Sequence, residues 1–168
     1  MRIFILIFFL SITNFSFAQV LKVNTMSIEG LGHSINGYSL NYDRIFHSND
    51  KYWVSNNTGV SYRTNQYAPQ RNWSISNTVN IVFGQKKGHL ELGTGLGVIK
   101  NLSHDYRSMT RALLLGRLGY RYQRPMGGFF MRASLTPNAM LYDNPKCIGW
   151  CDLDLIVHFI GVSLGYSF

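Results

Sequence analysis

The sequence has little charge and no apolar run long enough to form a membrane-spanning helix. Charged residues make up 14% of its 168 residues, whereas about 25% is usual for a soluble globular protein. This low share indicates that water is not the only solvent that the protein meets. A membrane helix needs about 20 apolar residues, and the stretch from Ile3 to Leu10 is soon followed by Ser11, Thr13 and Asn14. We therefore expect no transmembrane helix.

The amino-terminal segment instead has the order of a secretory signal peptide. Arg2 precedes the apolar stretch from Ile3 to Leu10, and small and polar residues then lead to Ala18. We expect cleavage after Ala18, which makes residues 1–18 a signal peptide and residues 19–168 a single domain. A retained membrane anchor is the alternative.

Cysteine is also scarce, because Cys147 and Cys151, in the sequence CIGWC, are the only two. In an exported protein such a pair favours a disulfide over free thiols, so we expect a bridge that holds the loop before the last strand. A metal site would need more ligands, and only His158 is near in sequence. We expect no metal and no cofactor.

Two-residue alternation dominates the rest of the chain, and no convincing stripe at helical spacing appears. In the last segment Ile160, Val162, Leu164, Tyr166 and Phe168 fall on one face of an extended chain, with glycine and serine on the other. Further strands are expected at residues 26–32, 38–42, 52–62, 74–83, 90–98, 112–122 and 129–135. The total of about eight is the number at which a small barrel closes.

The connections between these strands alternate in length. Apart from a short first connection, the odd-numbered ones are long, whereas the even-numbered ones, FHSNDK, GQKKG and QRPMGG, are tight. Antiparallel strands bring all odd connections to one end, so one end is plain and the other elaborated, as in outer-membrane barrels. The sequence therefore predicts an all-β fold, an eight-stranded antiparallel transmembrane up-and-down β-barrel that follows the signal peptide.

Volume decides which face of the strands points inward. One face is rich in glycine and serine, as in Gly93, Gly95 and Gly97. The other carries roughly forty large apolar side chains, which could not fit into a narrow cylinder at normal packing density. We therefore expect the apolar face to meet lipid and the small polar face to line the lumen. Phe168 would then end the strand that closes the barrel, with its ring at the membrane boundary.

The face assigned to the lumen also carries charge. Its alternation includes three acids and three arginines, namely Glu29, Asp43, Glu91, Arg117, Arg121 and Arg132. Unpaired charges are costly in a narrow space of reduced dielectric, whereas acids and arginines can satisfy one another. We expect these residues to form a plug that closes the lumen near its periplasmic end. The alternative is that water solvates each side chain separately.

Four stretches carry a resemblance to a known family: YSLNYDR from Tyr38, FGQKKGHLELGTGLG from Phe83, GYRYQRPMGGFFMRASLTP from Gly119 and GVSLGYSF from Gly161. They resemble the small outer-membrane β-barrel proteins common in Bacteroidetes, which share their architecture with OmpA- and OmpX-like barrels. The resemblance covers most of the chain after Tyr38. It implies that Phe168, with Tyr166, is the signal read by the barrel-assembly machinery. It brings no catalytic motif, so we expect no enzymatic activity.

Three other sequence patterns resemble functional sites but have simpler structural interpretations. The glycines from Gly93 to Gly97 are not a phosphate loop, because no helix follows them. Ser103, His104 and Asp105 are the right residue types for nucleophilic catalysis, but neighbours in sequence rarely form a triad, so a polar loop is expected. The histidines near strand ends are expected at the membrane interface or in solvent; they are His33, His47, His89 and His158.

The chain is basic, with a formal net charge of +8. An exported protein meets anionic lipid rather than nucleic acid, so no nucleic-acid partner is expected. Five basic residues gather by topology at the loop end, as candidate contacts for lipopolysaccharide phosphates or as ordinary solvated charges: Arg63, Arg71, Lys100, Arg107 and Arg111.

Taken together, these patterns predict a monomeric barrel of the cell outer membrane that has a closed polar lumen. Its role would be structural, or would lie in surface interaction through extracellular loops with an unidentified partner. Two alternatives stay open. One is a small transporter or channel for apolar or small solutes, and the other is a lipid-modifying outer-membrane enzyme.

Overall fold

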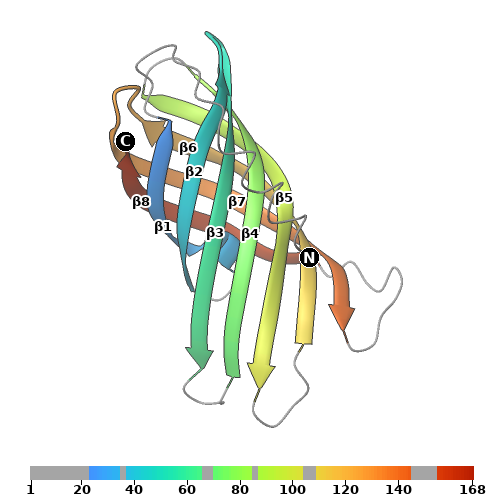
Figure 1. The fold of residues 1–168 in the computed structure, drawn as a ribbon. Helices are drawn as coiled ribbons and strands as arrows, with labels where there is room; N and C mark the ends of the chain where they lie inside the picture. The colour runs from blue at the N-terminus through green and yellow to red at the C-terminus, as the bar shows by residue number, and fades with distance from the viewer. Residues whose placement is uncertain (1–22, 35–36, 66–69, 85–86, 104–108, 145–154) are drawn as a thin grey trace, which may run out of the picture.

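A computed structural model of the chain describes residues 23–34, 37–65, 70–84, 87–103, 109–144 and 155–168. These residues form one closed barrel of eight antiparallel strands, in which each strand pairs with its neighbours in the chain and β8 pairs with β1 (Figure 1). The strands are β1 (Asn24–Leu31), β2 (Tyr38–Ser48), β3 (Tyr52–Asn65), β4 (Gln70–Phe83), β5 (Gly88–Ser103), β6 (Met109–Gln123), β7 (Gly128–Asn144) and β8 (Leu155–Ser167). One turn of 3-10 helix, η1 (Gly32–Ser34), follows β1. The predicted all-β barrel is confirmed.

The two ends of the barrel differ in the length of their connections and in how far the strands extend. The tight connections after β2, β4 and β6 lie at the same end as the start of β1 and the end of β8, and we call this the turn end. At the opposite end, the loop end, the middle strands extend beyond the first hairpin (Figure 1). The pairing of β1 with β2 stops at Gly30 and Tyr38, whereas β3 and β4 remain paired as far as Asn65 and Gln70.

The last long connection is shorter than the sequence suggests. The sequence pattern assigns Pro137 to the loop, whereas β7 continues through it to Asn144. Proline fits at this place because the pairing of β6 with β7 is interrupted there, between the pairs Leu115–Asn138 and Leu118–Leu135, and proline is tolerated at such irregularities since it has no N–H to donate. The expected disulfide residues of that loop, Cys147 and Cys151, lie outside the described residues, as does the expected signal peptide.

The outward face of the barrel is apolar, as predicted. Ile28, Leu96 and Leu164 are 59%, 60% and 52% exposed, respectively. Exposed aromatic residues gather toward both ends of this belt: Tyr38, Tyr62 and Trp73 toward the loop end, and Phe83, Tyr120, Phe129, Tyr166 and Phe168 toward the turn end. An apolar belt with aromatic girdles is the surface that lipid requires.

The described part of the chain contains no helix that is both long and apolar enough to cross a membrane.

The barrel closes through a close approach of β1 and β8. Phe168 exchanges two backbone hydrogen bonds with Asn24, of 2.8 and 3.2 Å, so the chain ends on the closing strand as expected. Gly165 is paired with Ser27 in this seam. A Cβ atom at this position would collide with the carbonyl oxygen of Met26 and would lie 2.6 Å from the Cβ of Ser27. Glycine is therefore required at this point of the seam.

This contact predicts a different tolerance at two glycines of the seam region. Gly165→Ala should lower the free energy of unfolding by about 1–3 kcal/mol, because the added methyl group overpacks the seam. Gly30→Ala is the matched control, since a Cβ there would meet only the Tyr38 ring at 3.7 Å. Urea titration of both variants, refolded in lipid vesicles, measures the difference. Equal free energies of unfolding for the two variants would contradict a close contact at Gly165.

Candidate functional site: the filled lumen

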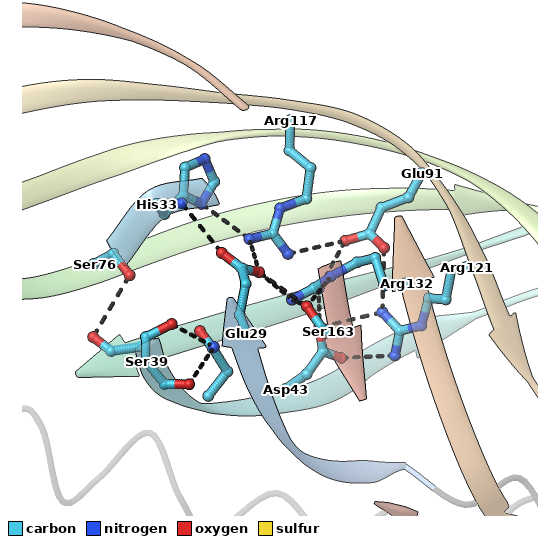
Figure 2. Close-up of polar contacts among 12 residues, drawn as sticks. Glu29, His33, Ser39, Asp43, Ser76, Glu91, Arg117, Arg121, Arg132 and Ser163 are labelled. Carbon is cyan, nitrogen blue, oxygen red and sulfur yellow. Dashed lines mark hydrogen bonds and ion pairs between the residues drawn. The ribbon is translucent and has the colours of Figure 1, made fainter. Parts of the chain in front are cut away.

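Strand alternation directs six charged side chains into the lumen. Glu29 comes from β1, Asp43 from β2, Glu91 from β5, Arg117 and Arg121 from β6, and Arg132 from β7. Each is at most 3% exposed, and ion pairs connect them all (Figure 2). The structure thus brings together the six residues that the sequence assigns to one lumen network.

Arg121 binds Asp43 through both ends of its guanidinium group. Nη2 donates to Oδ1 at 2.9 Å and Nη1 donates to Oδ2 at 3.2 Å. The same side chain donates from Nε to Oε1 of Gln123 at 2.7 Å, and the Ser55 hydroxyl donates to Asp43 Oδ2 at 3.3 Å. Two parallel charge-assisted bonds fix the orientation of both side chains as well as pairing their charges.

Arg132 connects the two glutamates. Its Nη2 lies 3.1 Å from Glu29 Oε2 and its Nη1 lies 3.3 Å from Glu91 Oε1. The Ser163 hydroxyl accepts from Arg132 Nε at 3.3 Å and donates to Glu29 Oε2 at 3.0 Å. Because these residues lie on β1, β5, β7 and β8, the contacts cross the lumen as well as the β1–β8 seam.

His33, at the tip of the first hairpin, folds into the lumen against Arg117. The Arg117 guanidinium donates to Glu29 Oε2 at 3.1 Å and to His33 Nδ1 at 2.9 Å. Since Nδ1 accepts, the ring proton is assigned to Nε2, which donates to the Gly116 carbonyl at 2.9 Å. The His33 backbone N–H donates to Glu29 Oε1 at 3.1 Å. The expectation of a solvated or interfacial His33 is therefore wrong, because the residue is buried.

The inward fold of this hairpin depends on an unusual backbone. Leu31 and Gly32 adopt left-handed conformations, with φ of 61° and 62°, and this reversal ends β1 before Gly32, where the sequence pattern predicts continued strand. A Cβ atom on Gly32 would lie 2.6 Å from Glu29 Oε1. Glycine is therefore what allows η1 to lie against the ion pairs.

An apolar layer closes the lumen at the turn end. Ile45, Trp53 and Val82 form a buried cluster, and Phe130 is fully buried as well. The Arg121 and Arg132 guanidinium carbons lie 5.0 and 5.6 Å from the centre of the Phe130 ring, within the range of cation–π attraction. This ring therefore joins the apolar floor to the charged layer.

His89 belongs to this floor and not to the membrane interface. Its ring centre lies 4.3 Å from that of Trp53, and the residue is 1% exposed. Its Nε2 lies 3.1 Å from the carbonyl oxygen of Gln123, within hydrogen-bonding distance. The expectation of a solvated His89 is wrong, because the inward strand position buries it beneath the charged layer.

A second apolar cluster faces the lumen toward the loop end. It contains Ile99, Leu113 and Leu115, with Met140 packed against it. The prediction of a uniformly small and polar inner face is therefore wrong at both ends of the lumen. The strand alternation gives a signal for this cluster, because Leu113 and Leu115 share the inward face of Arg117.

The inner layers can fill and seal the barrel. Three acids and three arginines balance in formal charge. Among the described residues, no group of three or more His, Cys, Asp and Glu side chains is placed to hold a metal ion. Among the described residues, Arg117 Nη1 and Glu91 Oε2 have no hydrogen-bond partner and take part only in longer ion pairs, at 3.6 Å from Glu91 Oε1 and 3.9 Å from Arg121 Nη1, respectively.

The remaining candidate residues lie away from this network. Lys100 is exposed on β5, and Arg111 is half-buried on β6 opposite Ile99. The backbones of Arg63 and Arg71 lie in the last pairs of β3 and β4, but their side chains lie outside the described part. Arg107 lies wholly outside it, and so do His104 and Asp105 of the Ser-His-Asp sequence. The structure does not bring the five basic residues together as a described site.

The network predicts a strong penalty when one charge is left alone. Asp43→Asn should lower the free energy of unfolding by about 3–5 kcal/mol, because Arg121 then stays buried without its carboxylate. The same change at the exposed Asp50 is the control and should cost less than about 1 kcal/mol.

Adding Arg121→Gln to Asp43→Asn restores charge balance, so the double variant should lose less than the sum of the single losses. Urea unfolding in vesicles, followed by tryptophan fluorescence, gives the free energies of unfolding of the unmodified chain, of Asp43→Asn, of Arg121→Gln and of the double variant. Additive losses would show that the two side chains do not act as a pair.

Comparison with known proteins gives little similarity at the level of sequence. No protein-family model matches the chain, and a search of curated proteins finds no match. Among solved structures, the chain is similar to Ail, the attachment invasion locus protein of Yersinia pestis, with 19% identity and a TM-score of 0.46 over 86% of this chain and 92% of that one. Neither the barrel described above nor the function proposed below rests on this likeness.

Proposed function

We propose that the protein is an integral barrel of a bacterial outer membrane that neither conducts solutes nor catalyses a reaction. It acts through the surfaces that it presents outside the lumen. The apolar belt, its aromatic girdles, the expected signal peptide and the resemblance to small barrels of Bacteroidetes all support this location.

The observation that carries the proposal is the closed lumen. From the turn end inward, an apolar floor of Ile45, Trp53, Val82 and Phe130 is followed by the ion-paired layer and then by η1 with His33. The first two layers are made of buried side chains from several strands, and the third is the 3-10 turn that carries His33. A transported solute would have to displace all three layers, and for the charged one the cost is that of separating buried ion pairs.

With the lumen closed, the extended loop end is the part of the barrel best placed to meet a partner. There β3 to β7 extend past the first hairpin (Figure 1), and Lys100 is exposed on the outer face of β5 toward this end. Lys100 is the described member of the basic set that is best placed for a lipopolysaccharide phosphate.

A second candidate, uptake of an apolar solute, is favoured by the apolar cluster of Ile99, Leu113 and Leu115 at the loop end of the lumen. This cluster could receive an apolar group from outside. The charged layer beneath it gives such a solute no continuous apolar path. We therefore rank this candidate below the closed barrel.

Conductance in planar bilayers tests the closed lumen. The unmodified protein should give no porin-sized current steps, because the apolar floor, the ion-paired layer and η1 lie one after another across the lumen. Combined replacement Glu91→Ala, Arg121→Ala and Phe130→Ala removes one acid, one base and the ring between the layers, and should produce measurable steps. Phe129→Ala is the matched control, since Phe129 faces outward, and it should stay silent.

Heat-modifiable migration on gels shows which variants are folded before conductance is measured. Porin-sized conductance from the unmodified protein would overturn the closed lumen. Recovery of the mature protein as a soluble periplasmic species would overturn the membrane location itself.

The terminal aromatic ring gives a further test, of delivery to the membrane. Phe168→Ala keeps the backbone bonds to Asn24 but removes the ring that the resemblance identifies as an assembly signal. We expect lower membrane levels in cells and unchanged spontaneous refolding into vesicles. Tyr166 faces the same way, so Tyr166→Ala should act in the same direction. Unchanged levels in cells would remove this role.

A further inference from the structure

The outward face of three neighbouring strands is polar in the middle of its apolar belt. The outward residues of β3 are Tyr52, Val54, Asn56, Thr58, Val60 and Tyr62, those of β4 are Trp73, Ile75, Asn77, Val79, Ile81 and Phe83, and those of β5 include Leu92, Thr94 and Leu96. On β3 and β4 the polar residues lie between aromatic residues at either end. We call Asn56, Thr58, Asn77 and Thr94 the midbelt patch.

The midbelt patch lies in the part of the membrane where an unpaired polar group costs the most free energy. Aromatic girdles mark the two boundaries of a membrane, so the midpoint between them lies near the centre of the hydrocarbon. In that region a polar group without a partner is costly, because no water can satisfy it. The polar groups of the patch therefore need hydrogen-bond partners from protein.

Contacts within the barrel satisfy much of the patch. Asn77 Nδ2 donates to Asn56 Oδ1 at 3.0 Å and to Thr58 Oγ1 at 2.8 Å, and Asn56 Nδ2 donates to Asn77 Oδ1 at 3.1 Å. The Thr58 hydroxyl donates to Asn56 Oδ1 at 3.3 Å. Thr94 is satisfied separately, because its hydroxyl donates to the carbonyl of Leu115 at 3.2 Å.

A donor and an acceptor are left over. An amide group has two hydrogens and its oxygen has two lone pairs. Within the described part of the chain, Asn56 uses one of its two amide hydrogens, and Asn77 Oδ1 accepts one hydrogen bond. The patch therefore has one free N–H and one free lone pair on adjacent strands of the outward face.

The patch is confined to one side of the barrel. In the closed order of strands, β8 lies opposite β4, and its outward residues are Ile160, Val162, Leu164 and Tyr166. Arg44 of β2 is paired with Asn56 and is half-buried. It lies toward the turn end of its strand, where a long side chain can reach the headgroups. One-sided polarity indicates a contact surface and not a general property of the belt.

We propose that the midbelt patch is the contact surface between two copies of this chain in the membrane, in place of the monomer that the sequence suggests. The inference rests on the proposed membrane location. A two-fold axis places the same surface on both sides of a contact, so the free N–H of Asn56 in each copy can meet the free lone pair of Asn77 in the other. The patch is thus complementary to itself, and polar groups of this kind hold membrane segments together.

Cysteine cross-linking in isolated outer membranes tests this contact. In a Cys147→Ser, Cys151→Ser background, Val79→Cys, at the outward position of β4 that pairs with Asn56, keeps both amides and should form a disulfide-linked dimer on oxidation with copper phenanthroline. Leu164→Cys, at an outward position of the opposite strand, is the matched control and should give several-fold less. A monomer at both positions would overturn the proposal. A product with a different protein from Val79→Cys would also overturn it, because the occupant would then not be a second copy.

Dissociation in vesicles gives a second, quantitative test. Fluorescence energy transfer between labelled barrels reports the dimer, and added lipid lowers the density of protein in the membrane. The double variant Asn56→Leu, Asn77→Leu has a weaker contact, so its dimer should dissociate at a protein density about tenfold higher than that of the unmodified chain. Val162→Leu on β8 should leave the transition unchanged. An unchanged transition in the double variant would overturn the role of the amides.

Heat-modifiable migration separates this inference from the proposed function on which it rests. Leucine suits lipid at least as well as asparagine does, so the double variant should still insert and migrate as a folded barrel. A barrel that inserts but stays monomeric contradicts the dimer alone. A chain that does not insert contradicts the membrane location.

Discussion

Charge neutrality inside a closed ring of strands is the constraint on which the rest of the structure depends. Arg117, Arg121 and Arg132 are enclosed by the barrel, and an unpaired charge in such a place costs several kcal/mol. Their acids come from strands across the lumen and not only from neighbours, since β1 and β2 supply Glu29 and Asp43. Backbone hydrogen bonds fix the circumference of the barrel, and the ion pairs fix its cross-section.

The first hairpin follows from that same network. Arg117 needs more acceptors than one carboxylate supplies, and His33 provides one from η1. The hairpin can reach it only because Leu31 and Gly32 turn the chain inward. As a consequence η1, with His33, lies against the ion pairs in the lumen, while the neighbouring strands extend past it. The same packing of η1 against Arg117 and Glu29 therefore shortens the first hairpin and helps to close the lumen.

Strand alternation accounts for most of what the sequence could predict. A period of two assigns every residue of a strand to lumen or lipid, which was enough to predict the barrel, the apolar exterior and the six charged residues. It could not predict the left-handed turn at Leu31, because a leucine gives no signal for positive φ. It also misplaced His33 and His89, since their burial depends on partners from distant strands. The apolar floor around Trp53 was missed because a polar inner face was assumed for the whole lumen.

Residues that do not suit their side of the barrel are the most informative about contacts. Inward apolar residues such as Leu113 and Leu115 find apolar neighbours within the same chain, so their placement needs no further partner. Outward polar residues differ, because Asn56 and Asn77 satisfy only part of each other's hydrogen-bonding capacity. Lipid cannot supply the rest. When the lumen is filled and sealed, the mismatch that remains lies on the outside of the barrel, where contact with a second copy would complete it.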